Sequence, residues 1–131
     1  MFRMLHPDIL MWLGKAGHHD FILITDAGYP EPRDVPCIHL NFAPGMIPFK
    51  VVVEGILATL PAVESVWVAQ ESCQQDTWPV LKDLLLPYPV EKIGPHDAFK
   101  AKAQECALVA IRTGEWHPYC NCLIEVGSLF S

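Results

Sequence analysis

Two adjacent histidines and two carboxylates lie near the start of the chain, on either side of a short apolar run. Gly17–Asp20 reads GHHD, and Asp26 directly follows the run FILIT at Phe21–Thr25. Imidazole titrates near neutral pH, so a positioned histidine can take or give a proton, and a nearby carboxylate can fix its tautomer. The group predicts either an acid–base site or a polar turn between a helix and a strand.

A metal site is a third interpretation of the histidine pair. Such a site needs three or four ligands, and two adjacent side chains seldom point at one ion. His39 and the Cys120-x-Cys122 pair offer further ligands, but the usual zinc spacings are absent. We therefore expect no metal ion.

A later histidine is expected at the start of a helix. His96 and Lys100 are four residues apart, so they share one helix face. In the first turn, the positive end of the helix dipole favours a neutral, hydrogen-bonding imidazole. The alternative is an exposed histidine without a chemical role.

The C-terminal segment offers groups that suit a sugar. If Tyr119–Val126 is a strand, Tyr119 and Asn121 share one of its faces and alternate with Cys120 and Cys122. A phenol and a carboxamide both donate and accept hydrogen bonds, as a polyhydroxyl ligand requires. A strand edge with one hydrated face is equally compatible with this pattern.

The elements that must position these residues alternate between helices and apolar strands. Such alternation predicts an α/β fold, a three-layer α/β/α arrangement with a mixed, largely parallel central sheet in a single domain over residues 1–131. Ligands of such sheets bind at the carboxyl ends of strands, where Asp26 and Arg112–Glu115 are expected to meet. The expected helices are Pro7–Ala16, Pro48–Leu60, Trp78–Leu86 and Pro95–Glu105, and the expected strands are Phe21–Thr25, Cys37–Phe42, Val63–Ala69, Val90–Ile93, Ala107–Ile111 and Tyr119–Val126.

Composition excludes some partners. The 131 residues carry a formal net charge of −6 and no basic patch, which argues against nucleic-acid binding. No apolar run approaches the roughly 20 residues of a membrane span, and the N-terminus does not look like a signal peptide. The chain is expected in the cytoplasm, where its five cysteines would be reduced thiols.

Four segments together resemble the ribose pyranase / fucose mutarotase family. They are LGKAGHHD (Leu13–Asp20), DAGYPEP (Asp26–Pro32), HDAFK (His96–Lys100) and RTGEWHPYCN (Arg112–Asn121). The family has a Gly-His-x-Asp motif, an Asp-Ala-Gly-x-Pro loop, a histidine or arginine on a late helix, and a Thr/Ser-Gly-Glu segment leading to Tyr-x-Asn. Each motif alone is weak, but four in this order and at similar spacing are specific.

The resemblance implies a sugar-mutarotase-like domain that interconverts cyclic forms of a free monosaccharide without cofactor or metal. It implies His18 as the proton donor. It also implies a substrate-binding set, namely Asp26, His96, Tyr119, Cys120 and Asn121.

Three neighbouring residues are assigned supporting or undecided roles. His19 falls on the variable position of the Gly-His-x-Asp motif, so it need not take part in the reaction. Asp20 is then the structural partner of His18. Lys100 matches a lysine of the pyranase branch, and its role is open.

The sugar itself is less closely defined. HDAFK and its His96 look more like the ribose pyranase branch, which favours interconversion of the pyranose and furanose forms of D-ribose. The opening segment looks as much like the fucose branch, so an L-fucose mutarotase that exchanges α and β anomers is the alternative. The segment Cys73–Tyr88 departs from both branches.

The resemblance also implies an assembly. Family members form ring-shaped homo-oligomers, commonly decamers, with sites at subunit interfaces. Exposed aromatic residues favour interfaces, and the four tryptophans are candidates, although Trp67 fits a core better. An interpretation from another class is a non-catalytic sugar-binding protein that serves sugar uptake.

Overall fold

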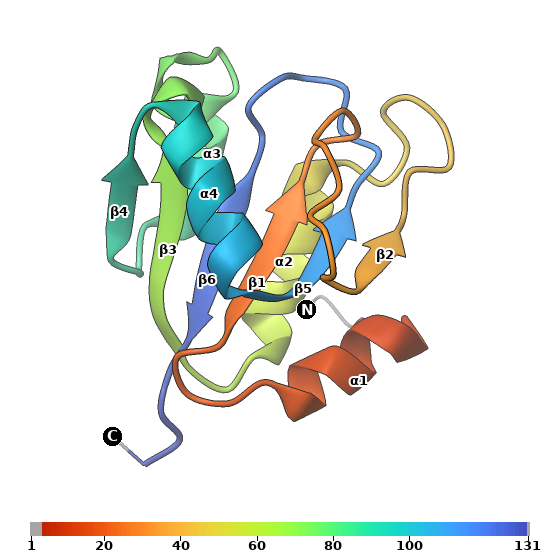
Figure 1. Cartoon of the computed structure of the whole chain (residues 1–131), viewed down its shortest axis with the longest axis vertical. Coiled ribbons are helices and arrows are strands. Elements are labelled where there is room, and N and C mark those ends of the chain that lie inside the picture. Colours follow the sequence, from red (N-terminus) through yellow and green to blue (C-terminus); the bar gives the residue numbers. More distant parts are fainter. Residues whose placement is uncertain (1–3, 131) are drawn as a thin grey trace.

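One mixed sheet of six strands organises the molecule, in the order β2-β5-β1-β6-β3-β4 (Figure 1). The computed structural model describes residues 4–130. All strands except β6 run in one direction, since β6 is antiparallel to both of its neighbours. The strands are β1 Phe21–Thr25, β2 Cys37–His39, β3 Val63–Ala69, β4 Val90–Ile93, β5 Ala107–Arg112 and β6 Cys122–Val126.

Helices cover both faces of this sheet. In β1, Leu23 packs in the core beneath α4, whereas Ile22 and Ile24 pack in the core beneath α1, α2 and α3. Successive strand residues point to opposite faces, so one continuous apolar run supplies both layers. The three-layer α/β/α prediction is confirmed. The helices are α1 Pro7–Lys15, α2 Phe49–Thr59, α3 Trp78–Leu85 and α4 His96–Cys106, with a short 3-10 helix η1 at Gln70–Gln74.

The predicted strand Tyr119–Val126 is wrong at its start. The strand begins only at Cys122, because Tyr119 adopts a left-handed conformation with a φ of 59° that an extended strand cannot contain. Tyr119 and Asn121 therefore do not share a strand face and lie in the loop before β6. The strand predicted at Cys37–Phe42 is likewise shorter and ends at His39.

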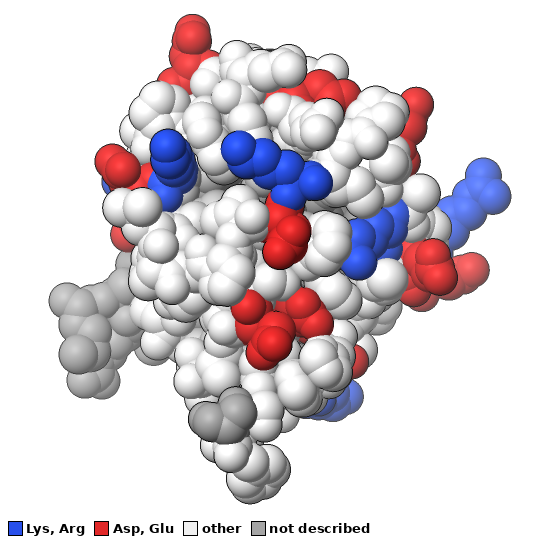
Figure 2. Space-filling view, turned by 90° about the vertical axis from the view of Figure 1, so that its left-hand side faces the viewer, with Lys and Arg blue, Asp and Glu red and all other residues white. Residues whose placement is uncertain are grey.

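The face of the molecule that carries β4 agrees with the charge balance of the sequence. Figure 2 shows the side of the molecule that carries β4, where lysines and arginines alternate with acidic residues and form no continuous basic patch. No helix in residues 4–130 has the length and apolar character needed to cross a membrane.

Candidate sugar-binding site

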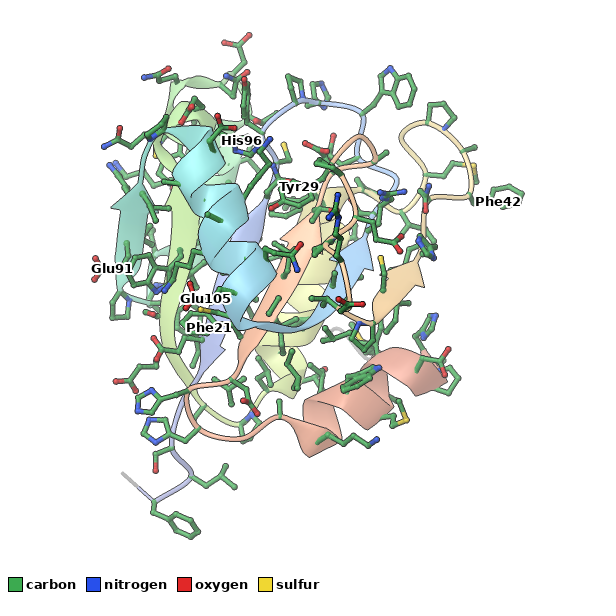
Figure 3. All side chains as sticks on the ribbon, in the orientation of Figure 1. Phe21, Tyr29, Phe42, Glu91, His96 and Glu105 are labelled. Carbon is green, nitrogen blue, oxygen red and sulfur yellow. The ribbon has the colours of Figure 1, made fainter. Side chains whose placement is uncertain are left out.

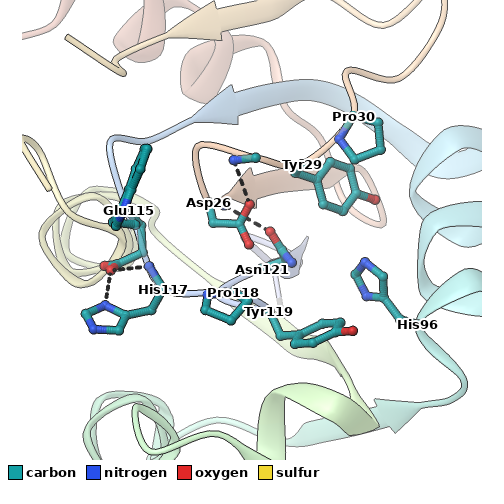
Figure 4. Close-up of a pocket in the computed structure, with 11 residues that line it drawn as sticks. Asp26, Tyr29, Pro30, His96, Glu115, His117, Pro118, Tyr119 and Asn121 are labelled. Carbon is teal, nitrogen blue, oxygen red and sulfur yellow. Dashed lines mark hydrogen bonds and ion pairs between the residues drawn. The ribbon is translucent and has the colours of Figure 1, made fainter. Parts of the chain in front are cut away.

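Three segments that are far apart in the sequence meet at one edge of the sheet and enclose a pocket of about 440 Å³ (Figure 4). They are the loop after β1, the loop between β5 and β6, and the first turn of α4. This is the carboxyl edge of the parallel strands, as the fold class predicts. The pocket is lined by Asp26, Gly28, Tyr29, Pro30, His96, Glu115, Trp116, His117, Pro118, Tyr119 and Asn121.

Asp26 and Asn121 form the floor of the pocket, and both are buried. The backbone N–H of Asp26 donates to Asn121 Oδ1 at 2.9 Å, and Asp26 Oδ1 accepts from the N–H of Gly28 at 3.0 Å. Burial raises the pKa of the Asp26 carboxyl, although backbone hydrogen bonds, led by that of Gly28, and the charge of His96 oppose the shift.

His96 is the first residue of α4 and projects into the pocket from the opposite wall. Its ring meets Tyr119 edge-on at 5.1 Å between centroids, meets Tyr29 edge-on at 6.0 Å, and stacks on Phe99. Its backbone N–H donates to Glu71 Oε2 at 2.7 Å, so η1 supplies the cap that Pro95 lacks. His96 Nδ1 and Glu71 Oε1 are both buried and have no hydrogen-bond partner among the described residues.

Burial and a neighbouring charge favour the neutral form of the His96 ring. Burial is the main cause that lowers the pKa of His96, and the positive charge of Lys100 lowers it further. Lys100 itself pairs with Asp97 at 3.2 Å and does not line the pocket. Lys100 therefore affects the pocket through the electrostatic effect of its positive charge on His96.

Tyr119 owes its place in the pocket to its unusual backbone. Its carbonyl accepts from Ser72 Oγ at 2.6 Å, which ties the loop before β6 to η1. A positive φ at a tyrosine costs about 1–3 kcal/mol and is maintained only where the surroundings enforce it. Here the strained turn directs the phenol towards His96.

Cys120 contributes differently from its neighbours. Its thiol is buried, lies 3.6 Å from Thr77 Oγ1 and faces a separate cavity beside α2 and α3, and burial raises its pKa to about 11. Its backbone N–H, however, hydrogen-bonds to Asp26. Within the described residues, Cys120 thus serves the pocket through its main chain, and the thiol is part of the core.

The structure adds pocket residues that the sequence patterns did not single out. Tyr29 lies 5% exposed beside His96, and Glu115 and His117 line the wall opposite Tyr29. Burial alone would raise the pKa of Glu115, but hydrogen bonds from His117 and from the Phe49 N–H lower it overall. In the sequence, the only sign that Glu115 lines the pocket is its position in RTGE, directly after a predicted strand.

His18 lies away from this pocket. It belongs to the turn before β1, whereas Asp26 follows β1, and a five-residue strand is roughly 17 Å long. Figure 3 shows the separation, with Phe21 at one end of the sheet and Tyr29 and His96 at the other. Within one chain, His18 and the pocket therefore do not meet.

The surroundings of His18 are nevertheless ordered. Its ring stacks on His19 at 3.7 Å between centroids, and its Nε2 lies 3.9 Å from Glu64 Oε2. Asp20 supports the turn through its carboxylate, which accepts from the Gly17 N–H at 2.8 Å. His19 has a φ of 72° and its Nδ1 lies 2.7 Å from Glu125 Oε2.

The fold and the pocket define a class of protein: a small α/β protein with a polar, ionisable pocket suited to a polyhydroxyl ligand. A sequence model described as the RbsD / FucU transport protein family matches residues 2–129. The chain belongs to this family, so the resemblance seen in the four motifs is confirmed.

Individual relatives agree with this assignment. The chain is 39% identical to a D-ribose pyranase of Bacillus licheniformis and 36% identical to that of Bacillus subtilis, over 97% of this chain and 96% of each relative. A solved structure of Bacillus subtilis RbsD complexed with D-ribose superimposes with a TM-score of 0.89 at 32% identity, covering 99% of this chain and 98% of that one. A fucose mutarotase of Streptococcus pneumoniae in complex with L-fucose gives a TM-score of 0.77 at 20% identity over 94% and 93%, and shares the fold.

Proposed function

We propose that this protein is a sugar isomerase, a mutarotase that interconverts the pyranose and furanose forms of D-ribose. The observation that carries the proposal is the pocket, in which Asp26 and His96 face the hydrogen-bonding groups of Tyr119 and Asn121. Its volume of about 440 Å³ lies at the small end of ligand sites, as a monosaccharide requires.

The proposed reaction needs only proton transfers, so no cofactor takes part. A base removes the proton of the anomeric hydroxyl while an acid delivers one to the ring oxygen, and the bond between the anomeric carbon and that oxygen breaks. Closure of the aldehyde through another hydroxyl gives the other ring size. Acid–base assistance of this kind contributes about 10²–10⁴-fold in rate, and we propose that His18 provides it.

Ribose is preferred to fucose as the substrate. The D-ribose pyranases named above share more than a third of their residues with this chain, whereas the fucose mutarotase structure shares 20%. Asp26, His96, Tyr119 and Asn121 are proposed to hold the sugar hydroxyls, with the Cys120 N–H stabilising Asp26.

We propose further that His18 enters the pocket of another copy in a homo-oligomer, such as the decamer that the family resemblance implies. His18 borders a second, more apolar cavity formed by the end of α1, the segment Thr59–Pro61 and the chain after β6. Leu129 and Phe130 lie there with 68% and 98% of their surfaces exposed, and exposed apolar residues of this kind favour contact with another protein surface.

The cytoplasmic location of the protein stays a prediction.

One-dimensional NMR saturation transfer on a panel containing ribose and fucose tests the substrate. We expect the protein to accelerate exchange between ribopyranose and ribofuranose more than anomer exchange of fucose. Faster exchange of fucose would indicate the L-fucose mutarotase instead. Saturable binding of ribose without any acceleration would indicate a sugar-binding protein.

Complementation between two inactive variants tests the shared site. We expect His18→Ala and Asn121→Ala chains each to lose ribose exchange. When they are unfolded together and reassembled, intact sites form between an unmodified pocket and an unmodified His18, and activity returns. Mixed assemblies that stay inactive, although native mass spectrometry shows both chains in them, would exclude a site shared in this way.

A further inference from the structure

A second group of ligand-type side chains lies outside the sugar pocket, at the free edge of the sheet. Glu31 comes from the loop after β1, and Cys37 and His39 lie two residues apart on the edge strand β2. A carboxylate oxygen, a thiol sulfur and an imidazole nitrogen lie within 4.8 Å of one another. Neither the GHHD motif nor the Cys120-x-Cys122 pair takes part in this group.

The three side chains converge because of the fold. Residues two apart on a strand point to the same face, which here is the face that α4 covers. The loop then returns Glu31 to that face, where its Oε1 lies 2.6 Å from His39 Nε2 and where the Cys37 thiol also hydrogen-bonds to it. Sequence separation alone gives no sign of this contact.

The chemistry and spacing of the donors match a particular class of ion. Thiolate, imidazole and carboxylate together favour Zn²⁺ and similar transition metals over Mg²⁺ or Ca²⁺, which prefer oxygen ligands alone. Two ligands on a tetrahedral Zn²⁺ stand about 3.3–3.7 Å apart. The Glu31–His39 pair has to open by less than roughly 1.1 Å to reach that spacing, and both side chains are about half exposed and free to adjust.

A positive group, Arg112, acts on this cluster. Arg112 is the register partner of His39 on the neighbouring strand, and its guanidinium donates to the Tyr29 carbonyl at 2.7 Å. Two anionic ligands outweigh its single charge, so the group stays net negative once the thiol is deprotonated. The Glu31 and His39 side chains are about half exposed, so water reaches the cluster and can supply a fourth ligand.

We propose that Glu31, Cys37 and His39 form a binding site for one Zn²⁺-like transition-metal ion, separate from the sugar pocket. Bound metal would replace the protons that now join the thiol and the imidazole to Glu31. Because Glu31 follows Pro30, which lines the sugar pocket, the ion would anchor the far side of that pocket loop.

Titration of the whole, metal-free protein with Co²⁺ tests the site. A thiolate ligand produces a charge-transfer absorption band in the near ultraviolet, and Zn²⁺ should displace the Co²⁺ and abolish the band. We expect one ion per chain, and an affinity at least about tenfold lower in Cys37→Ser, His39→Gln and Glu31→Gln, since even the loss of an outer-shell partner costs that much.

Cys106→Ser is the matched control, because Cys106 is another half-buried thiol outside the group. It should bind Co²⁺ as the wild-type protein does. Circular dichroism establishes that each variant is folded. Absence of the band in the wild-type protein, or a band that survives Cys37→Ser, would overturn the proposal and leave the Glu31–His39 contact as a simple tie of the loop. Ribose exchange measured without metal keeps this outcome separate from the proposed function.

Discussion

Burial favours the uncharged form of both ionisable residues that face each other across the sugar pocket. It raises the pKa of Asp26 and lowers the pKa of His96, so each residue moves towards its uncharged form. A neutral imidazole both donates and accepts a hydrogen bond, as a sugar hydroxyl does. An uncharged His96 can therefore form hydrogen bonds with sugar hydroxyls in either direction, whereas a charged one could only donate.

The pKa of His96 leads to a prediction about acid stability. The native protein binds the His96 proton more weakly than the unfolded chain, whose ordinary value is 6.5. The stability that neutral His96 provides is therefore present above that pH and is lost as the pH falls through the native pKa. Urea unfolding should show the wild-type advantage over His96→Gln shrinking between about pH 7.5 and about pH 5. An advantage that is equal at both values contradicts the shift.

Lys100 offers a second test of the same residue. Its positive charge lowers the pKa of His96 after burial does, so Lys100→Met should raise the His96 pKa part of the way towards 6.5. NMR titration of the His96 ring in both proteins measures the change. Lys82→Met on α3 is the control and should leave the titration unaltered. An equal effect of both variants would argue for a general charge effect.

His19 yields a prediction for the other histidine site. Its contacts with the His18 ring and with Glu125 suggest that it holds His18 in place. We expect His19→Ala to slow ribose exchange several-fold without weakening ribose binding, since His19 lines no part of the pocket. Glu125→Gln retains a side-chain partner for His19 and should keep most of the wild-type rate. Unchanged exchange in His19→Ala would make His19 a surface residue without a role.

At the scale of elements, the short helix η1 positions two walls of the pocket. Glu71 caps the first turn of α4 and holds His96, and Ser72 holds the Tyr119 carbonyl. A five-residue 3-10 helix has little stability of its own. Its value lies in tying α4 to the loop before β6, so that His96 and Tyr119 keep a constant separation.

Replacing Glu71 tests this connection. Glu71→Ala removes the acceptor of the His96 N–H, and we expect the free energy of unfolding to fall by about 1–2 kcal/mol and the KM for ribose to rise. Glu71→Gln keeps an oxygen acceptor, so its free energy of unfolding and its KM for ribose should stay close to the wild-type values. Thermal melts and NMR exchange provide the two measurements. An unchanged KM in Glu71→Ala would show that the Glu71 cap does not affect ribose binding.

At the scale of the whole molecule, the distance between His18 and the pocket makes assembly part of the proposed function. The exposed C-terminal residues beside His18 should then be buried in the oligomer. Burying one phenylalanine contributes about 1.5–3 kcal/mol, so Phe130→Ser should weaken assembly and lower ribose exchange together. Light scattering coupled to size exclusion measures the assembly.

Leu86→Ser is the control for this variant, since Leu86 is also 68% exposed but lies at the end of α3, far along the chain from His18. It should leave the oligomer and the exchange rate as they are. A monomeric wild-type protein with full exchange activity would contradict the proposed role of assembly.

Much of the architecture follows from the sequence alone. The apolar periodicities and proline positions predicted the four α-helices and most strands to within a residue or two, because these signals are local, but they did not predict the 3-10 helix η1. The four motifs predicted the family, and placing Asp26 at the end of a buried strand predicted which edge of the sheet carries the pocket. Local chemistry sufficed for each of these conclusions.

Tertiary structure alone decided how the side chains meet. It placed Tyr119 in a strained loop and brought the Glu71 carboxylate to the backbone N–H of His96. It also gathered Glu31 with Cys37 and His39 at the free sheet edge. These contacts depend on strand register and on hydrogen bonds between residues remote in sequence, which no local periodicity encodes.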